Sequence, residues 1–314
     1  MNRNNKFPFF SIIINCYNGE AFLNEAIKSV YNQSFTDWEI IFFDNASTDE
    51  SSKIAKSFDK RIKYYYNDNL IPLGSARNRA IKKANGKYLA FLDCDDTWEP
   101  TKLLKQKKTL ETSVSDRGYA FCYTDAMRIN HVGRNIMPFS QERENKNGDV
   151  FLSLMGDCFI SMSSCVLDRK ICLKLGGFDE AFQYVEEWQL WLKVSQQYDL
   201  AYVPERLTNI RFHSGNTSKD YQGQSLEVMS MLQKIKVKPY QLKKKRTFMN
   251  MFKIRFLIIH TAHCFKNNFI QGLMSSLSLL WLCLSHPKIS LELFKKYLSL
   301  KLLKFFYTKY FKNN

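Results

Sequence analysis

Short, mainly apolar runs punctuate the first 100 residues, at 10–14, 39–43, 62–66 and 88–92. Each run has the length of one strand, and its apolar side chains do not strictly alternate with polar ones, so both faces of the strand are expected to be buried. Strands of this kind are typical of a parallel sheet that is covered on both sides.

Helical spacing fills the intervals between these runs. In the first interval, an apolar residue recurs every three or four positions, which marks one face of a helix: Leu23, Ala26, Ile27, Val30 and Tyr31. A second helix is expected from Ser47 or Thr48, either of which would cap it, to about residue 58. A third is expected over 75–85, closed by Gly86. The alternation predicts an α/β fold with a Rossmann-like, mostly parallel sheet flanked by helices.

The pattern is less regular beyond residue 100. A strand is expected at 119–129, a polar loop at 131–148, a break at Gly176 and Gly177, and a helix at 186–197. We expect this irregular stretch to face the substrate.

Residues 221–314 differ from the rest of the chain in charge. They hold 17 lysines and arginines against two acidic residues, Glu227 and Glu292, whereas residues 1–220 hold 29 basic and 28 acidic residues. We therefore predict a main domain over 1–220 and a basic α-helical C-terminal extension over 221–314. Basic helices with an apolar face adsorb to anionic membrane surfaces, and basic segments also bind nucleic acid.

The uncharged run at 267–287 is most apolar over residues 273–284 only. A bilayer core requires roughly 20 mainly apolar residues, which favours a buried or interfacial helix over a membrane span. At the N-terminus, the apolar run is too short for a secretory signal. The eight cysteines form no C-x-x-C pair and have mainly apolar neighbours, which is typical of reduced thiols and favours the cytoplasm.

Three carboxylates follow the fourth predicted strand directly, in Asp93-Cys94-Asp95-Asp96. Carboxylates packed this closely repel one another, and a hard divalent cation relieves the repulsion while it leaves positions for phosphate oxygens and water. The alternative is a solvated turn that caps the next helix.

Polar loops also follow the first two predicted strands, at 15–18 and 44–49. Ligands of open α/β sheets bind at the carboxyl edge of the strands, where these loops are expected to meet the aspartates. Neither G-x-G-x-x-G nor G-x-x-x-x-G-K-[ST] is present, which argues against a dinucleotide dehydrogenase and a P-loop enzyme. A nucleotide-diphosphate ligand whose charge is borne by a metal fits this pattern.

Four stretches together resemble a known family. SIIINCYNGEAFLNEAIKSVYNQSFTDWEIIFFDNASTD and GSARNRAIKKANGKYLAFLDCDD are similar to the nucleotide-binding half of family 2 glycosyltransferases, the inverting enzymes of GT-A fold. GGFDEAFQYVEEWQLWLKV and RFHSGNTS resemble their acceptor-half motifs. The similarity covers about residues 10–218 and implies a bacterial enzyme of polysaccharide or glycolipid synthesis.

The resemblance implies a role for each matching donor-site residue. Tyr17, with Asn18 beside it, and Asp44, with Asn45 beside it, match positions at the base and ribose of the donor, and Arg77 matches an arginine that approaches the nucleotide. Many relatives have Asp-Asp where this chain has Asp44-Asn45, which leaves the nucleobase open.

The remaining matches concern the metal and the proton transfer. Asp93 and Asp95 match the D-x-D motif, with Asp95 as the main ligand of Mn²⁺ or Mg²⁺ and Asp93 nearer the ribose, while His213 faces the diphosphate or the metal. Glu187 matches the general base, which is usually an aspartate, and Glu186 is expected to share or take that role.

The expected activity is an inverting, metal-dependent transfer of a sugar from a nucleotide-diphosphate donor, with a UDP-sugar favoured, to a hydroxyl of a lipid-linked glycan or glycolipid acceptor. The basic extension places the enzyme as a peripheral protein on the inner face of the cytoplasmic membrane, without a nucleic-acid partner. The alternatives are a nucleic-acid-binding protein that uses the extension, and an inactive family member that acts as a scaffold.

Overall fold

The structure is a computed structural model, which describes residues 7–112, 119–141, 146–213, 215, 221–251, 253–254 and 284–286. The chain divides into two compact units, Met1–Asn216 and Thr217–Asn314. The residues singled out above for donor, metal and acid–base chemistry all lie in the first unit.

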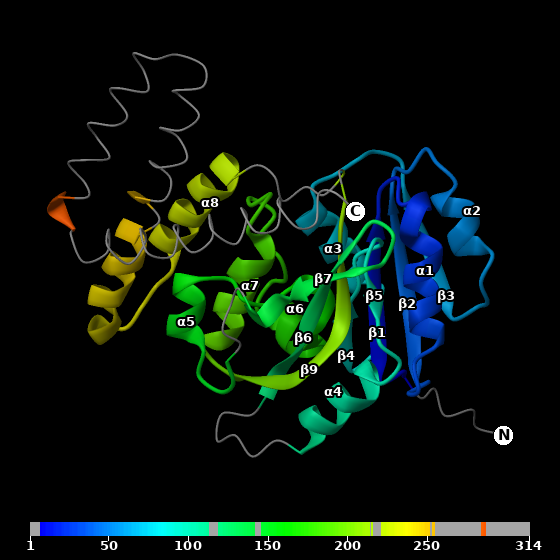
Figure 1. Cartoon of the computed structure of the whole chain (residues 1–314), viewed down its shortest axis with the longest axis horizontal. Helices are drawn as coiled ribbons and strands as arrows, with labels where there is room; N and C mark the ends of the chain where they lie inside the picture. The colour runs from blue at the N-terminus through cyan, green and yellow to red at the C-terminus, as the bar shows by residue number, and fades with distance from the viewer. Residues whose placement is uncertain are drawn as a thin grey trace, which may run out of the picture. The chain divides into compact units, whose positions relative to one another are not determined.

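One sheet organises the first unit, with its strands in the order β3-β2-β1-β4-β8-β6-β9-β5 and β7 paired to β6 (Figure 1). Its first half consists of four parallel strands: β1 (Phe10–Cys16), β2 (Trp38–Asn45), β3 (Ile62–Asn67) and β4 (Tyr88–Phe91). The mostly apolar runs of the sequence form these strands, so the predicted parallel sheet is confirmed for this half.

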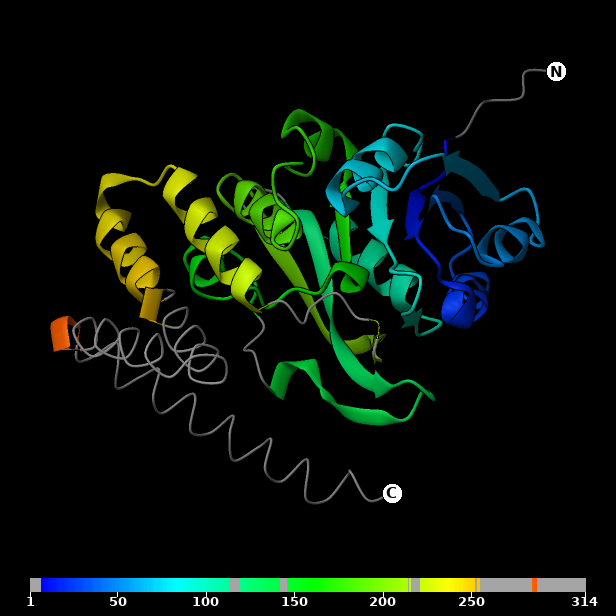
Figure 2. The ribbon, with the colours of Figure 1, turned by 90° about the horizontal axis from the view of Figure 1, so that it is seen from above.

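Helices cover both faces of this parallel half. They are α1 (Glu20–Tyr31), α2 (Ser51–Lys56) and α3 (Leu73–Ile81). Figures 1 and 2 show α1 and α3 on opposite sides of the strands. Ile12 and Ile14 of β1 share one core cluster with Leu23 and Ile27 of α1. Alternate side chains of a strand point to opposite faces, so consecutive apolar residues in β1 supply both layers of core.

The second half of the sheet is mixed. Its strands are β5 (Thr97–Trp98), β6 (Tyr119–Asn130), β7 (Asn135–Pro138), β8 (Cys165–Asp168) and β9 (Asp199–Phe212). β8 runs antiparallel to both β4 and β6, while β9 runs parallel to β6 and antiparallel to β5. The helices of this half are α4 (Lys102–Glu111), α5 (Phe151–Gly156), α6 (Arg169–Lys174) and α7 (Glu186–Ser195), with short 3-10 turns η1 (Phe139–Gln141) and η2 (Met162–Ser164).

Three local expectations were wrong. The second helix begins after Glu50 and not at Ser47 or Thr48, because the Ser47 hydroxyl accepts a hydrogen bond from the backbone N–H of Asn18 instead. The third helix runs from Leu73 to Ile81 and ends before Gly86, whose backbone packs against Ser11. The loop expected at 131–148 contains β7 and η1.

The second unit contains α8 (Tyr221–Lys234) and the 3-10 turn η4 (Pro239–Gln241), followed by a helical segment at 242–251. Within the part of this unit that the structure describes, no helix is both long and apolar enough to cross a bilayer. Most of the apolar run at 267–287 lies outside the described residues.

Candidate active site

The ends of β1, β2 and β4 meet at one edge of the sheet. Cys16 pairs in register with Asp44, and Ile13 pairs with Phe91, so the loops after all three strands leave from the same side. Gly19 allows close packing there, since a Cβ at this position would lie 2.7 Å from Cys16 Sγ and 3.0 Å from Cys94 Sγ. The polar loops therefore lie beside the aspartate segment, as the alternating pattern predicts.

The loops after β1 and β2 are joined to each other by reciprocal hydrogen bonds. Asn18 donates its backbone N–H to Ser47 Oγ at 3.0 Å, and its Oδ1 accepts from the Thr48 N–H at 2.8 Å. Asn18 has a φ of 52°, a left-handed conformation that asparagine tolerates better than most residues. The side chain of Asn18 thus fixes the loop, while the Tyr17 side chain beside it is 49% exposed.

Asp44 is fully buried. Its carboxylate accepts hydrogen bonds from Tyr64 Oη at 2.6 Å and from the Ser47 N–H at 2.8 Å. Burial, together with this bond to Asp44, raises the pKa of Tyr64 to about 12, so the phenol keeps its proton and donates it. Asp44 is held rigidly at the strand end.

Asn45 explains one departure from the family pattern. Its Nδ2 donates to the Ile71 carbonyl at 2.8 Å, and its Oδ1 accepts from the Ile71 N–H at 3.2 Å. An aspartate cannot donate the first of these bonds. The amide therefore anchors the segment that leads into α3.

Arg77 of α3 lies at the centre of a buried charge cluster. Its Nη1 is 2.7 Å from Glu186 Oε1, and its Nη2 is 3.2 Å from Asp93 Oδ1. Burial acts to lower the pKa of Arg77, but the charges of Asp93, Glu186 and Glu187 outweigh it and raise that pKa. The cluster joins the nucleotide half of the unit, through α3 and β4, to the start of α7.

The two glutamates at the start of α7 differ in surroundings. Glu186 is buried and ion-paired with Arg77, whereas Glu187 is half-buried and close enough to Arg77 to influence its pKa. Of the pair, Glu187 is therefore the more exposed to solvent.

The GGFDE segment before α7 holds α3 in place. Asn78 donates to the Phe178 carbonyl and accepts from the Phe178 N–H, both at 2.9 Å, and Ser75 Oγ donates to Glu180 at 2.7 Å. Gly177 has a φ of 68°, and a Cβ there would collide with Asn78. This motif therefore sets the position of Arg77.

On the other side of the aspartate segment, Asp95 and His213 form a pair. His213 Nε2 lies 2.9 Å from Asp95 Oδ2, and their side chains are 21% and 24% exposed. A carboxylate and an imidazole are both common metal ligands. Within the described part of the chain, no three His, Cys, Asp or Glu side chains gather closely enough to hold a metal alone. The two side chains would supply two ligands to a divalent cation.

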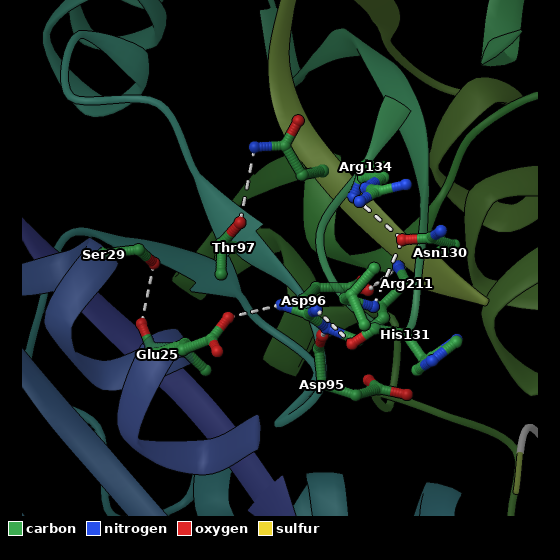
Figure 3. A network of polar contacts seen from close by, with 12 residues as sticks. Glu25, Ser29, Asp95, Asp96, Thr97, Asn130, His131, Arg134 and Arg211 are labelled. Carbon is green, nitrogen blue, oxygen red and sulfur yellow. Dashed lines mark hydrogen bonds and ion pairs between the residues drawn. The ribbon is translucent and has the colours of Figure 1, made fainter. Parts of the chain in front are cut away.

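Asp96, from the predicted acidic cluster, supports this pair together with Ser163 and Arg211, which were not predicted. Asp96 is buried and accepts from Ser163 Oγ at 2.6 Å and from the backbone N–H of Arg211 at 2.9 Å. Ser163 Oγ in turn accepts from the Asp93 N–H at 3.0 Å. Figure 3 shows Arg211 beside Asp95 and Asp96. In the sequence, the one available signal is the R-x-H spacing of Arg211 and His213.

Comparisons with known proteins agree with this geometry. The profile described as Glycosyl transferase family 2 matches residues 11–167. An uncharacterized glycosyltransferase of Rickettsia bellii is 32% identical over 210 residues, which are 66% of this chain and only 29% of that protein. The UDP-Glc:alpha-D-GlcNAc-diphosphoundecaprenol beta-1,3-glucosyltransferase WfgD of Escherichia coli is 32% identical over 198 residues, 62% of this chain and 72% of WfgD.

A solved structure also matches the fold. S. aureus TarS, residues 1-349 in complex with UDP-GlcNAc, superposes with a TM-score of 0.60 at 15% identity, over 87% of this chain and 81% of that one. The predicted α/β fold of GT-A type is confirmed.

Proposed function

The chain belongs to glycosyl transferase family 2, and from this premise we propose that it is an inverting, metal-dependent sugar transferase. The donor is a nucleotide-diphosphate sugar, and a UDP-sugar is favoured. The observation that carries the proposal is the placement of two sets of groups on either side of one aspartate segment: the Asp95–His213 pair and the Arg77–Glu186–Glu187 cluster.

Glu187 acts as the general base. Its carboxylate removes the proton of the acceptor hydroxyl as the oxygen attacks the anomeric carbon, from the face opposite the diphosphate. The diphosphate departs with the bonding electrons, so the configuration inverts and no covalent enzyme intermediate forms. Glu186, buried against Arg77, positions the first turn of α7 and with it Glu187.

Asp95 and His213 hold the divalent cation, Mn²⁺ or Mg²⁺, which offsets the negative charge of the leaving diphosphate when it is bound. Arg77 keeps Asp93 oriented toward the ribose. Tyr17, exposed beside the rigid Asn18 loop, contacts the base, and the buried Asp44 and Asn45 fix the floor beneath it.

We also propose a lipid-linked glycan acceptor in surface polysaccharide synthesis. The name of WfgD specifies a diphosphoundecaprenol acceptor, and the basic extension of this chain favours anionic lipid. The protein then lies on the inner face of the cytoplasmic membrane. Flotation with vesicles of anionic and of neutral lipid tests this placement, and equal flotation with both contradicts it.

Transfer by purified variants tests the catalytic assignment. A thermal-shift screen of UDP- and GDP-sugars with Mn²⁺ first identifies the donor. Glu187→Gln is expected to lower kcat by about 10²- to 10⁴-fold while donor binding persists. Asp95→Asn is expected to abolish the Mn²⁺-dependent part of that binding.

Glu111→Gln is the matched control, because it makes the same glutamate-to-glutamine change but breaks only an exposed ion pair with Lys107 on α4. Its kcat should stay within about twofold of the wild type. Near-normal transfer by the Glu187→Gln variant would falsify the base assignment.

A further inference from the structure

Arg211, near the end of β9, is the most extensively bonded side chain around the aspartate segment. It is 2% exposed, and its Nε donates to the Asp95 carbonyl at 2.9 Å. Its Nη1 donates to the His131 carbonyl at 3.1 Å, and its Nη2 donates to Glu25 Oε2 at 2.6 Å. Since its backbone N–H also donates to Asp96 Oδ1, one residue holds both the Asp95 carbonyl and the Asp96 carboxylate (Figure 3).

A closed ring of contacts links this guanidinium to the Asp95–His213 pair. The Arg211 guanidinium lies 4.6 Å from the centre of the Phe22 ring, and the Phe22 ring lies 5.0 Å from the His213 ring. His213 then meets the Asp95 carboxylate, and the Asp95 carbonyl returns to Arg211. Arg211 is the next-to-last residue of β9 and His213 directly follows the strand, so a short stretch of chain joins the two ends of this ring.

Glu25 fixes the orientation of the Arg211 guanidinium. It lies on α1, its side chain is 61% exposed, and it contacts the Nη2 atom that neither main-chain carbonyl uses. Two carbonyls and one carboxylate in the guanidinium plane define the orientation of an arginine fork, which a lysine cannot reproduce. α1 thereby gains a direct connection to the metal-binding segment.

We propose that Arg211, oriented by Glu25 and Phe22, is a positioning residue that holds Asp95 and His213 at the separation needed to bind a divalent cation with a nucleotide diphosphate. The inference rests on the proposed function. Outer partners that orient metal ligands typically contribute 10- to 100-fold to affinity, although they do not touch the metal. We call Arg211, Glu25 and Phe22 the clamp. A substitution that loosens it should weaken binding of the diphosphate and leave the base, Glu187, unaffected.

Two measurements on the full-length protein test the clamp. The first is the Kd of UDP, and of GDP, at saturating Mn²⁺ by calorimetry. Arg211→Lys is expected to raise the Kd about tenfold or more, and Glu25→Gln about threefold, because Glu25 is partly solvated. Phe22→Leu should raise it, whereas Phe22→Tyr keeps the ring and should behave as wild type.

The second measurement is the rate at which diethyl pyrocarbonate labels His213 without nucleotide, resolved by mass spectrometry. Arg211→Lys, Glu25→Gln and Phe22→Leu should each label faster at His213. Glu111→Gln breaks an exposed ion pair with Lys107 on α4 and is the matched control, with both readouts unchanged. With an active donor, KM should rise while kcat stays within about twofold.

The outcomes separate the two proposals. Unchanged Kd and unchanged labelling in Glu25→Gln and Phe22→Leu overturn the clamp, even if Arg211→Lys fails to fold. A wild-type protein that binds neither UDP nor GDP with Mn²⁺ overturns the proposed function, and the labelling rates still decide whether Arg211 orients His213.

Discussion

Two buried arginines flank the aspartate segment, and they hold it in different ways. Arg77, 4% exposed, bonds to carboxylate side chains, those of Asp93 and Glu186. Arg211, 2% exposed, bonds to two main-chain carbonyls, that of Asp95 within the segment and that of His131 between β6 and β7, and to one carboxylate at the surface, that of Glu25.

The two arginines therefore differ in what they contribute: Arg77 balances buried charge, and Arg211 sets the path of the backbone. On the Arg77 side, one cation offsets charges that would otherwise repel each other in a buried site. On the Arg211 side, the guanidinium is a rigid fork that sets the path of the peptide which carries Asp95. Substitutions around Arg77 should therefore lower mainly the free energy of unfolding, and substitutions around Arg211 should lower mainly the affinity for the ligand.

The largest loss of stability is expected from Arg77→Met. The substitution leaves Glu186 buried without its cation, which costs about 3–5 kcal/mol in the free energy of unfolding. The double variant Arg77→Met/Glu186→Met removes both charges and should recover most of that loss. Urea unfolding at neutral pH measures both. If the double variant is no more stable than the single one, the loss comes from packing and not from the unpaired carboxylate.

Lys102 of α4 sharpens the comparison, because it is a third buried cation with a different set of partners. Its side chain is fully buried, its Nζ donates to Gln106 Oε1 at 2.7 Å, and it lies 4.1 Å from the centre of the Trp98 ring. Burial lowers the pKa of Lys102 to about 7, in contrast to the raised pKa of Arg77. The guanidinium of Arg77 has the higher intrinsic pKa and is paired with carboxylates, so it stays charged, whereas burial without a carboxylate partner favours the neutral form of Lys102.

The expected consequence is a stability that depends on pH. Between pH 7 and about 10 the unfolded lysine holds a proton that the folded one has lost, so the wild type becomes more stable as pH rises. Lys102→Met removes this dependence and should stabilise the fold by about 4–5 kcal/mol at pH 6, since each unit by which the pKa is lowered corresponds to about 1.4 kcal/mol. Its advantage should shrink toward pH 10. If the difference in the free energy of unfolding between the two proteins stays constant from pH 6 to pH 10, the lowered pKa of Lys102 is wrong.

The parallel half of the fold could be predicted because its strands are mainly apolar runs and a helix follows each of the first three. The mixed half could not. β9 carries the exposed Pro204, Glu205 and Arg206 in its middle, and its register with β6 shifts at Thr124 and Asp125. β7 lies in a mainly polar stretch of the chain, so the local sequence did not predict a strand there. The strand forms because it pairs with β6.

The candidate site shows the same division. Asp93, Asp95, Glu187 and His213 were identified by their resemblance to family motifs, although 118 positions separate the Asp95–His213 pair. Ser163, Phe22 and Glu25 escaped prediction, because their roles depend on contacts between distant segments. A serine in an apolar stretch or a glutamate on a helix surface carries no local sign of such a contact.

The smallest of these effects is expected from Asn45→Asp. This substitution tests how much the neutral hydrogen bonds between Asn45 and Ile71 stabilise the segment that leads into α3, the helix of Arg77. The aspartate would lose the bond to the Ile71 carbonyl and place a negative oxygen against it, at a cost of about 1–2 kcal/mol at neutral pH. Protonation restores a donor, so the deficit should shrink as pH falls below about 4. The free energy of unfolding at pH 7 and at pH 3.5 measures this, with Asn85→Asp as a control, because Nδ2 of Asn85 lies at the limit of hydrogen-bonding distance from its carbonyl. A deficit in Asn45→Asp that does not change with pH would mean that the carboxylate has turned away from Ile71, and that the segment before α3 is held without it.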